Sequence, residues 1–201
     1  MIGLNRRRAM GDALPYDAEI EYLESDGNQF IDTNYIPTGT DNEFEISFRY
    51  LGYVNIDPTN PSFAQIFYAF ISSNHLMYRI IIRKSDSASN IYNGNIYNAG
   101  NLILSKNIDY IVKANSSNII VNNVYINWAF VSGQTNTAKI RILKTDTKAR
   151  IKSFKWVKGN NVMFDMIPVR VGQVGYMYDK VSGQLFGNSG TGNFILGNDV
   201  N

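Results

Sequence analysis

The chain contains no cysteine among its 201 residues, and histidine occurs only once, as His75. Without cysteine the fold uses no disulfide, and it offers neither a thiolate ligand for a metal nor a cysteine nucleophile. A single histidine excludes a site built from several histidines. His75 follows Ser-Ser-Asn, a composition typical of a surface turn, and no serine–histidine–aspartate arrangement surrounds it.

Long apolar runs and strong charge are absent as well. No stretch approaches the ~18 consecutive apolar residues that a membrane helix needs. Residues 1–10 carry charge without a following apolar segment, so they do not form a secretory signal. The charged fraction is 18% and the net charge is only +2, so the chain as a whole is not expected to behave as a polyelectrolyte.

The residues that are present favour one all-β domain behind a short arm. A hydrophobic fraction of 44% with 13% aromatic residues is enough for a sizeable core in one domain of this length. Residues 1–16 form a basic arm, and residues 17–201 form the domain. Strict alternation over 43–50 places Phe44, Ile46 and Phe48 on one face of a strand.

Turn-punctuated short strands continue through the domain. Asn93-Gly94 between matched Ile-Tyr pairs predicts a hairpin over 90–98. Further strands are expected at 66–71, 76–83, 108–113, 119–126, 139–143, 150–157 and 162–169. About a dozen short strands and no helical periodicity after the arm indicate a sandwich or barrel.

The two ends of the domain carry particular motifs. Residues 22–33 read Tyr-Leu-Glu-Ser-Asp-Gly-Asn-Gln-Phe-Ile-Asp-Thr, and residues 168–170 read Pro-Val-Arg. Residues 175–179 read Gly-Tyr-Met-Tyr-Asp, and residues 185–194 read Leu-Phe-Gly-Asn-Ser-Gly-Thr-Gly-Asn-Phe. Gly, Asn and Asp in these motifs are expected to set corners, while the aromatic residues fill the core.

These motifs resemble those of the concanavalin A-like, laminin-G-like jelly-roll domains of gut bacteria and their phages. That family typically opens with Tyr-Ile-Glu-Ser-x-Gly-x-Gln-Tyr-Ile-Asp-Thr and closes with Pro-Val-Arg, Gly-Leu-Tyr-Asp and Phe-Tyr-x-Asn-x-Gly-Thr-Gly-x-Phe. Leu23, Phe30, Met177 and Gly187 depart from it, and the middle of the chain matches only in strand rhythm. The resemblance implies a two-sheet antiparallel jelly roll whose first and last strands lie together.

Some members of this broad fold are glycosidases, which need two carboxylates flanking the scissile bond. Glu19, Glu21 and Glu24 loosely resemble the Glu-x-Asp-x-x-Glu strand of laminarinase-like enzymes. The middle aspartate is missing, however, and Glu24 needs a bulge to join the other two. Glu43 and Glu45 share the solvent-facing side of their strand. No catalytic residue is assigned, and we expect no enzyme activity.

A bound cofactor is not expected either. Calcium takes six to eight oxygen ligands, usually from several aspartates. The loops after the first strands offer candidates without a dense Asp-x-Asp-x-Asp run, and turn formation explains the same residues more simply. These candidates are Asp26, Asn28, Asp32, Asn34 and Asp41.

Two surfaces could bind a partner. Tyr53, Tyr92, Tyr97 and Trp128 are candidates for stacking on a glycan, although tyrosines also serve in cores and subunit contacts. A basic band between residues 139 and 158 could face an acidic partner, or could be a solvated edge whose lysines discourage strand pairing. Aromatic residues do not interleave with this band, so direct contact with nucleic acid is not expected.

The arm joins three arginines to apolar neighbours. Its candidate partner-binding residues are Leu4, Arg6, Arg7, Arg8 and Met10. This composition suits an acidic, partly apolar groove, and similar leaders occur in phage proteins of the Bacteroides world. We therefore expect a non-enzymatic virion structural protein, a capsid decoration or a head or tail fibre component, assembled in the bacterial cytoplasm beside other virion subunits. The alternative is a glycan-binding adhesion module.

Overall fold

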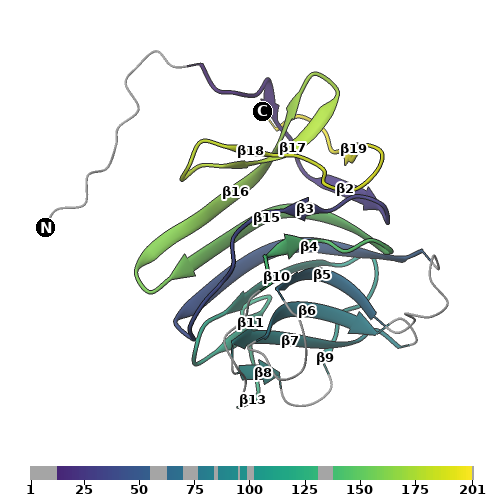
Figure 1. Cartoon of the computed structure of the whole chain (residues 1–201). Helices are drawn as coiled ribbons and strands as arrows, with labels where there is room; N and C mark the ends of the chain where they lie inside the picture. Colours follow the sequence, from purple (N-terminus) through teal and green to yellow (C-terminus); the bar gives the residue numbers. More distant parts are fainter. Residues whose placement is uncertain are drawn as a thin grey trace, which may run out of the picture.

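The computed structural model describes residues 13–54, 63–69, 77–83, 86–94, 96–98, 102–130 and 138–200. All regular elements in these ranges are β-strands, and they form two antiparallel sheets packed face to face (Figure 1). The predicted all-β sandwich of jelly-roll type is therefore confirmed. The arm residues 4–10 and His75 lie outside the described residues.

The first sheet has eleven strands, with the central order β12-β11-β10-β4-β15-β16-β17-β18. Short strands at the chain ends complete it, since β1 pairs with β16 and β2 lies between β15 and β19. The bounds are β1 (Ala18–Glu19), β2 (Leu23–Asp26), β4 (Asn42–Tyr53), β10 (Asp109–Ala114), β11 (Ile119–Val121), β12 (Val124–Ile126), β15 (Thr147–Lys158), β16 (Asn161–Val171), β17 (Val174–Asp179), β18 (Leu185–Phe186) and β19 (Ile195–Leu196).

The second sheet has eight strands in the order β13-β8-β7-β6-β5-β14-β3, and β9 adds to β7. The bounds are β3 (Ile31–Asp32), β5 (Phe63–Ala69), β6 (Met77–Arg83), β7 (Ala88–Gly94), β8 (Ile96–Asn98), β9 (Leu102–Ile103), β13 (Trp128–Phe130) and β14 (Arg141–Ile142).

The core lies between the sheets and follows from the alternation of apolar and polar residues along each strand. In β4 the side chains of Phe44, Ile46 and Phe48 are buried. The intervening residues face solvent, as the sequence predicts. Trp156 on β15 is fully buried, and its ring stacks on that of Phe44 with centroids 6.2 Å apart. Burial of each such side chain stabilises the fold by about 1.5–3 kcal/mol.

A buried asparagine joins the two sheets through hydrogen bonds. Asn42 Nδ2 donates to the hydroxyl of Tyr78 on β6 at 2.9 Å and to the carbonyl oxygens of Thr38 and Gly39. The indole N–H of Trp156 donates to Asn42 Oδ1 at 3.2 Å. Every polar atom of this amide therefore has a partner in the core, as a buried amide requires.

The two chain ends meet in the first sheet. Leu23 on β2 lies directly opposite Leu196 on β19, so the expectation that the first and last strands lie together is confirmed. The terminal motifs are also joined by side chains. Gln29 Nε2 donates to Thr191 O at 3.2 Å, and Phe30 N donates to Asn188 Oδ1 at 3.1 Å.

Two turns differ in detail from the sequence-based expectation. In the 90–98 hairpin Asn93 pairs with Ile96, so the turn begins at Gly94, which has φ +64°. The strand expected over 119–126 is broken into β11 and β12 at Asn122 and Asn123, with φ +48° and +66°. Asparagine tolerates this left-handed backbone, and two such residues in succession make a tight hairpin turn.

Candidate functional site

A single row of paired residues crosses the solvent-facing side of the second sheet. Tyr97 on β8 lies opposite Tyr92 on β7, and Tyr92 lies opposite Arg79 on β6. The row continues through Tyr68 on β5 to β14 and β3. We call it the Tyr–Arg row, and its members are Asp32, Tyr68, Arg79, Tyr92, Tyr97 and Arg141.

All six side chains of the Tyr–Arg row are half-buried, while their neighbours along the strands point into the core. Tyr78 and Ile80, on either side of Arg79, are both fully buried. The row covers five strand spacings of ~4.8 Å, so it is ~24 Å long. It therefore forms an elongated polar and aromatic surface on a sheet that its buried face holds rigid.

Aromatic and cationic groups stack along one half of the row. The rings of Tyr92 and Tyr97 are nearly parallel, at 18°, with centroids 5.5 Å apart. The guanidinium carbon of Arg79 lies 4.7 Å from the centre of the Tyr92 ring. Burial lowers the pKa of Arg79, and its contact with Tyr92 opposes that shift. The Arg79 cation is thus held against an aromatic face, which attracts it electrostatically.

An acid–base pair closes the other half of the row. Arg141 Nε donates to Asp32 Oδ2 at 3.1 Å, and its guanidinium carbon lies 5.4 Å from the centre of the Phe30 ring. Hydrogen bonding to Tyr68, and then to Asp32, raises the pKa of Arg141. This end of the row presents hydrogen-bonding groups with fixed orientation.

The outermost ring of the row has an open neighbour position. Tyr97 pairs with Ala129 on the edge strand β13. The side chains of paired positions lie about 4.5–5.5 Å apart, so among the described residues the ring face of Tyr97 that points away from Tyr92 opposes the methyl group of Ala129. A flat apolar ligand surface could lie on that face.

The other two predicted stacking residues lie elsewhere. Trp128 is opposite Asn98, one position from Ala129, and so points to the inner side, where it packs partly buried against the core. Tyr53 ends β4 in the first sheet, where Lys106 Nζ lies 5.5 Å from the centre of its ring. The structure therefore brings together Tyr92 and Tyr97 of the four.

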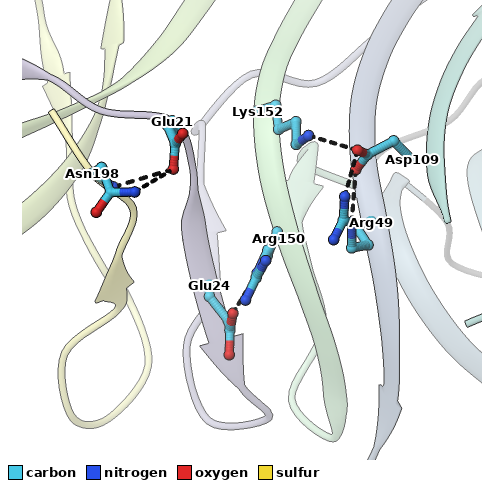
Figure 2. A network of polar contacts seen from close by, with 7 residues as sticks. All are labelled: Glu21, Glu24, Arg49, Asp109, Arg150, Lys152 and Asn198. Atoms are coloured by element: carbon cyan, nitrogen blue, oxygen red, sulfur yellow. Dashed lines mark hydrogen bonds and ion pairs between the residues drawn. The ribbon is translucent and has the colours of Figure 1, made fainter. Parts of the chain in front are cut away.

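Part of the basic band of residues 139–158 is matched by carboxylates from distant parts of the chain. On the outer face of the first sheet Arg150 Nε donates to Glu24 at 2.6 Å, and Lys152 lies 2.9 Å from Asp109 (Figure 2). Asp109 also accepts from Arg49 at 2.6 Å, and these cations lower its pKa to about 2. Among the described residues, three of the eight cations of the band, Arg141, Arg150 and Lys152, are thus paired with carboxylates in the fold.

The three glutamates of the first strands have separate partners. Glu19 accepts from the Tyr16 hydroxyl at 3.0 Å, and Glu21 accepts from Asn198 Nδ2 at 3.1 Å. Glu24 accepts from Arg150, as Figure 2 shows. The strand is also interrupted between β1 and β2. Each carboxylate therefore holds a neighbouring element of the first sheet.

A hollow of about 230 Å³ opens on the outer face of the first sheet. Its charged lining includes Lys113 and Glu45, which form an ion pair at 3.0 Å, together with Glu43 and Lys155. Its single aromatic side chain, Phe44, belongs to the core. The hollow offers charged groups without an accessible ring, and so lacks the combination that the Tyr–Arg row provides.

The candidate calcium ligands serve the turns. Asp26 Oδ1 accepts from the backbone and side-chain nitrogens of Asn28, and Asp32 Oδ1 accepts from Asn34 N at 2.8 Å. Across the described ranges no group of three or more histidine or acidic side chains is close enough to hold a metal ion. The same ranges contain no helix with the length and apolar character needed to cross a bilayer.

No model of a known protein family matches this chain, and no curated protein matches it.

Of the remaining members of the Tyr–Arg row, Asp32 was considered only as a calcium ligand and Arg141 only as part of the basic band, while Tyr68 and Arg79 were not considered. Arg79 and Tyr68 each occupy an outward position that alternation within a single strand can indicate. Which outward residues stand in one row depends on the register of six strands, and the sequence gives no signal for that register.

Proposed function

We propose that this protein is a non-enzymatic binding module that holds a carbohydrate along the Tyr–Arg row. The observation that supports this most directly is the stack of Tyr97, Tyr92 and Arg79 in register on a rigid sheet, with Ala129 leaving one face of Tyr97 open. Sugar rings combine apolar C–H faces with many hydroxyls. The C–H face fits an open tyrosine ring, and the hydroxyls need oriented polar groups nearby.

The polar half of the row supplies such groups. The guanidinium of Arg141 and the carboxylate of Asp32 hold each other in place at 3.1 Å. Fixed donors and acceptors lose little conformational entropy when a ligand binds, which favours affinity. The length of the row, ~24 Å, suits several linked sugar units better than a single one.

Glycan arrays with the full-length protein test this proposal. Tyr97→Ala removes the open ring and should abolish binding. Ala129→Leu keeps the ring and fills the space beside it, so it should also abolish binding although it removes no contact. Val181→Ala, in an exposed turn of the other sheet, is the control and should bind as the wild type does. No binding to any host polysaccharide, or binding that survives Ala129→Leu, would refute the proposed site.

The absence of catalysis is part of the proposal. Glu21 and Glu24, the best carboxylate candidates, each accept a hydrogen bond from a structural neighbour, Asn198 and Arg150. A retaining or inverting glycosidase needs two carboxyl groups that face one substrate. Release of reducing ends from a bound glycan, lost in Glu21→Gln or Glu24→Gln, would contradict this part.

As the setting of this module we propose a bacteriophage virion, in which the N-terminal arm attaches the domain to capsid or fibre subunits. The terminal motifs and the arginine-bearing arm support this proposal. The junction between the arm and the domain is firmly held: the centroid of the Tyr16 ring lies 4.9 Å from that of Tyr178, and Asp17 Oδ2 accepts from Gly172 N at 2.7 Å. Force applied to an anchored arm would therefore pass directly into the first sheet.

Deletion of residues 1–14 separates attachment from glycan binding. The shortened domain should keep its fold and its glycan binding but should no longer join the particle. Replacing Arg6, Arg7 and Arg8 together by alanine should have the same effect at unchanged length. Normal incorporation of both variants would rule out the arm as the anchor.

A further inference from the structure

Both sheets end at the same side of the sandwich in edge strands that come from one short stretch of chain. Among the described strands, β12 is the edge of the first sheet and β13 is the edge of the second. Only Asn127 separates the two strands. This side of the molecule, here called the lateral edge, therefore consists of residues 124–130.

The lateral edge lies within a stretch that has no charge. Residues 114–138, 25 in number, include no Asp, Glu, Lys, Arg or His. Exposed edge strands usually carry charged residues, because unpaired N–H and C=O groups otherwise invite another strand. At the opposite end of the second sheet β3 does carry such a residue, Asp32, in an ion pair with Arg141.

Large apolar side chains are exposed along the lateral edge. Tyr125 is 71% exposed, Phe130 69% and Val124 61%. In β12 Tyr125 lies opposite Ile120, on the outer face, while Val124 lies opposite the buried Val121, on the inner face. An apolar strip thus continues from the core onto an open strand edge, which is typical of interaction sites.

We propose that the lateral edge binds a second copy of this chain, with β12 pairing antiparallel to β12 of that copy about a twofold axis at Tyr125. An antiparallel pair of identical strands is self-complementary, so each residue finds the same partner in both copies. The uncharged stretch favours this occupant, because self-pairing brings no like charges together. A strongly acidic or basic partner, in contrast, would find no complementary charge there.

Pairing in this register has a direct consequence for the first sheet. The sheets of the two copies become one continuous sheet, and the two Tyr125 side chains meet directly across the junction. Paired strands lie 4.7–4.9 Å apart, which brings the rings into contact. The Tyr–Arg row is on the other sheet and contains no residue of β12, although Ala129 beside its outermost ring belongs to the lateral edge.

Light scattering after size exclusion, over a concentration series of the full-length protein, tests the proposal. The wild type should form a dimer. Tyr125→Lys places two lysines opposite each other at the junction, and the dimer dissociation constant should rise at least tenfold. Val181→Lys is the matched control, because Val181 is 52% exposed in the turn after β17, and its dimer should be unchanged.

A mixing experiment separates loss of the contact from loss of the fold. Tyr125→Lys and Tyr125→Glu should each be monomeric alone and should form a heterodimer when mixed, because opposite charges then meet at the junction. Far-UV circular dichroism of each variant verifies the fold. A wild type that stays monomeric at all concentrations, a dimer unaffected by Tyr125→Lys, or equal weakening by Val181→Lys would overturn the proposal. Failure of the two charged variants to associate would overturn it as well.

Discussion

Replacement of Asn42 by alanine should be the most damaging single amide substitution in the described core. Its side chain takes part in four hydrogen bonds: donation to Thr38 O, Gly39 O and the Tyr78 hydroxyl, and acceptance from the Trp156 indole. These contacts join the first sheet to the second. Loss of the Asn42 amide therefore weakens the contact between the two sheets of the sandwich.

The partners left behind determine the size of the effect. The Tyr78 hydroxyl can still donate to Gly39 O, so it remains satisfied. The Trp156 N–H is fully buried and would lose Asn42 Oδ1, which leaves only its interaction with the Tyr35 hydroxyl, and this weaker pairing costs up to about 1–3 kcal/mol. Each of the other hydrogen bonds contributes about 0.5–1.5 kcal/mol net, and relaxation of the neighbouring residues offsets part of their loss. The free energy of unfolding should therefore fall by about 2–5 kcal/mol in total. Most domains have about 5–15 kcal/mol of stability, so the variant should fold but be strongly destabilised.

Urea unfolding followed by circular dichroism measures this change as a shift in midpoint. A double-mutant cycle with Trp156→Phe isolates the contribution of the bond between the indole N–H and Asn42. In that background Asn42→Ala leaves no N–H unpaired and should cost about 1–2 kcal/mol less than in the wild type. Asn198→Ala is the control, because its exposed amide binds only the exposed Glu21, and it should change stability by less than about 0.5 kcal/mol. A cost of Asn42→Ala below about 1 kcal/mol, or strict additivity in the cycle, would refute the reasoning.

Three further predictions concern the first sheet and its corners. The pKa of Asp109 is about 2 in the fold against an ordinary 3.8, so its ion pairs stabilise the protein above pH 4 and lose that effect as the pH falls towards 2. Because Asp109 is largely exposed, its ion pairs should contribute less than about 1 kcal/mol to stability. In Asp109→Asn the midpoint of urea unfolding should depend less on pH between pH 4 and 2 than in the wild type; an equal pH dependence in both proteins would contradict this. Gly190→Ala would place a Cβ 2.0 Å from the Asn28 carbonyl oxygen, so the backbone must shift and the free energy of unfolding should fall by about 2–4 kcal/mol. Calorimetry should show a lower Tm; an unchanged Tm would show that the turn around Gly190 adapts without strain. The Tyr50 hydroxyl is buried without a hydrogen-bond partner among the described residues, and burial raises its pKa to about 12. Tyr50→Phe should therefore leave the free energy of unfolding unchanged or raise it by up to about 1 kcal/mol. A clear loss of stability in urea unfolding would reveal a partner of the hydroxyl.

The strands were largely predictable because alternation is a local property. Phe44, Ile46 and Phe48 alternate with polar residues, and this pattern alone identifies β4 and its buried face. The break at Asn122 and Asn123 was missed, because an Asn-Asn pair without glycine is a weak turn signal beside a continuous apolar pattern. Its left-handed backbone is visible only in the structure.

The partners of each strand could not be predicted, and the candidate site depends on them. Tyr92 and Tyr97 were identified as aromatic candidates since they flank one hairpin, where pairing follows from the turn. Arg79 and Arg141 join them only through the order and register of separate strands. The same limit applies to charge: the local sequence around Arg150 shows a basic band, whereas its carboxylate partner, Glu24, is 126 residues away.

The closing of the first strand by the last has a consequence for how the protein is made. β2 needs β19 beside it, and Glu21 and Asn198, whose side chains bond across this junction, are 177 residues apart. During synthesis β2 is therefore uncovered on this side until β19 has left the ribosome. Such long-range pairing slows folding and leaves apolar strand edges exposed for longer. Loss of β19 should thus promote aggregation of the product, because it uncovers the edge of β2 and removes Leu196 from the core.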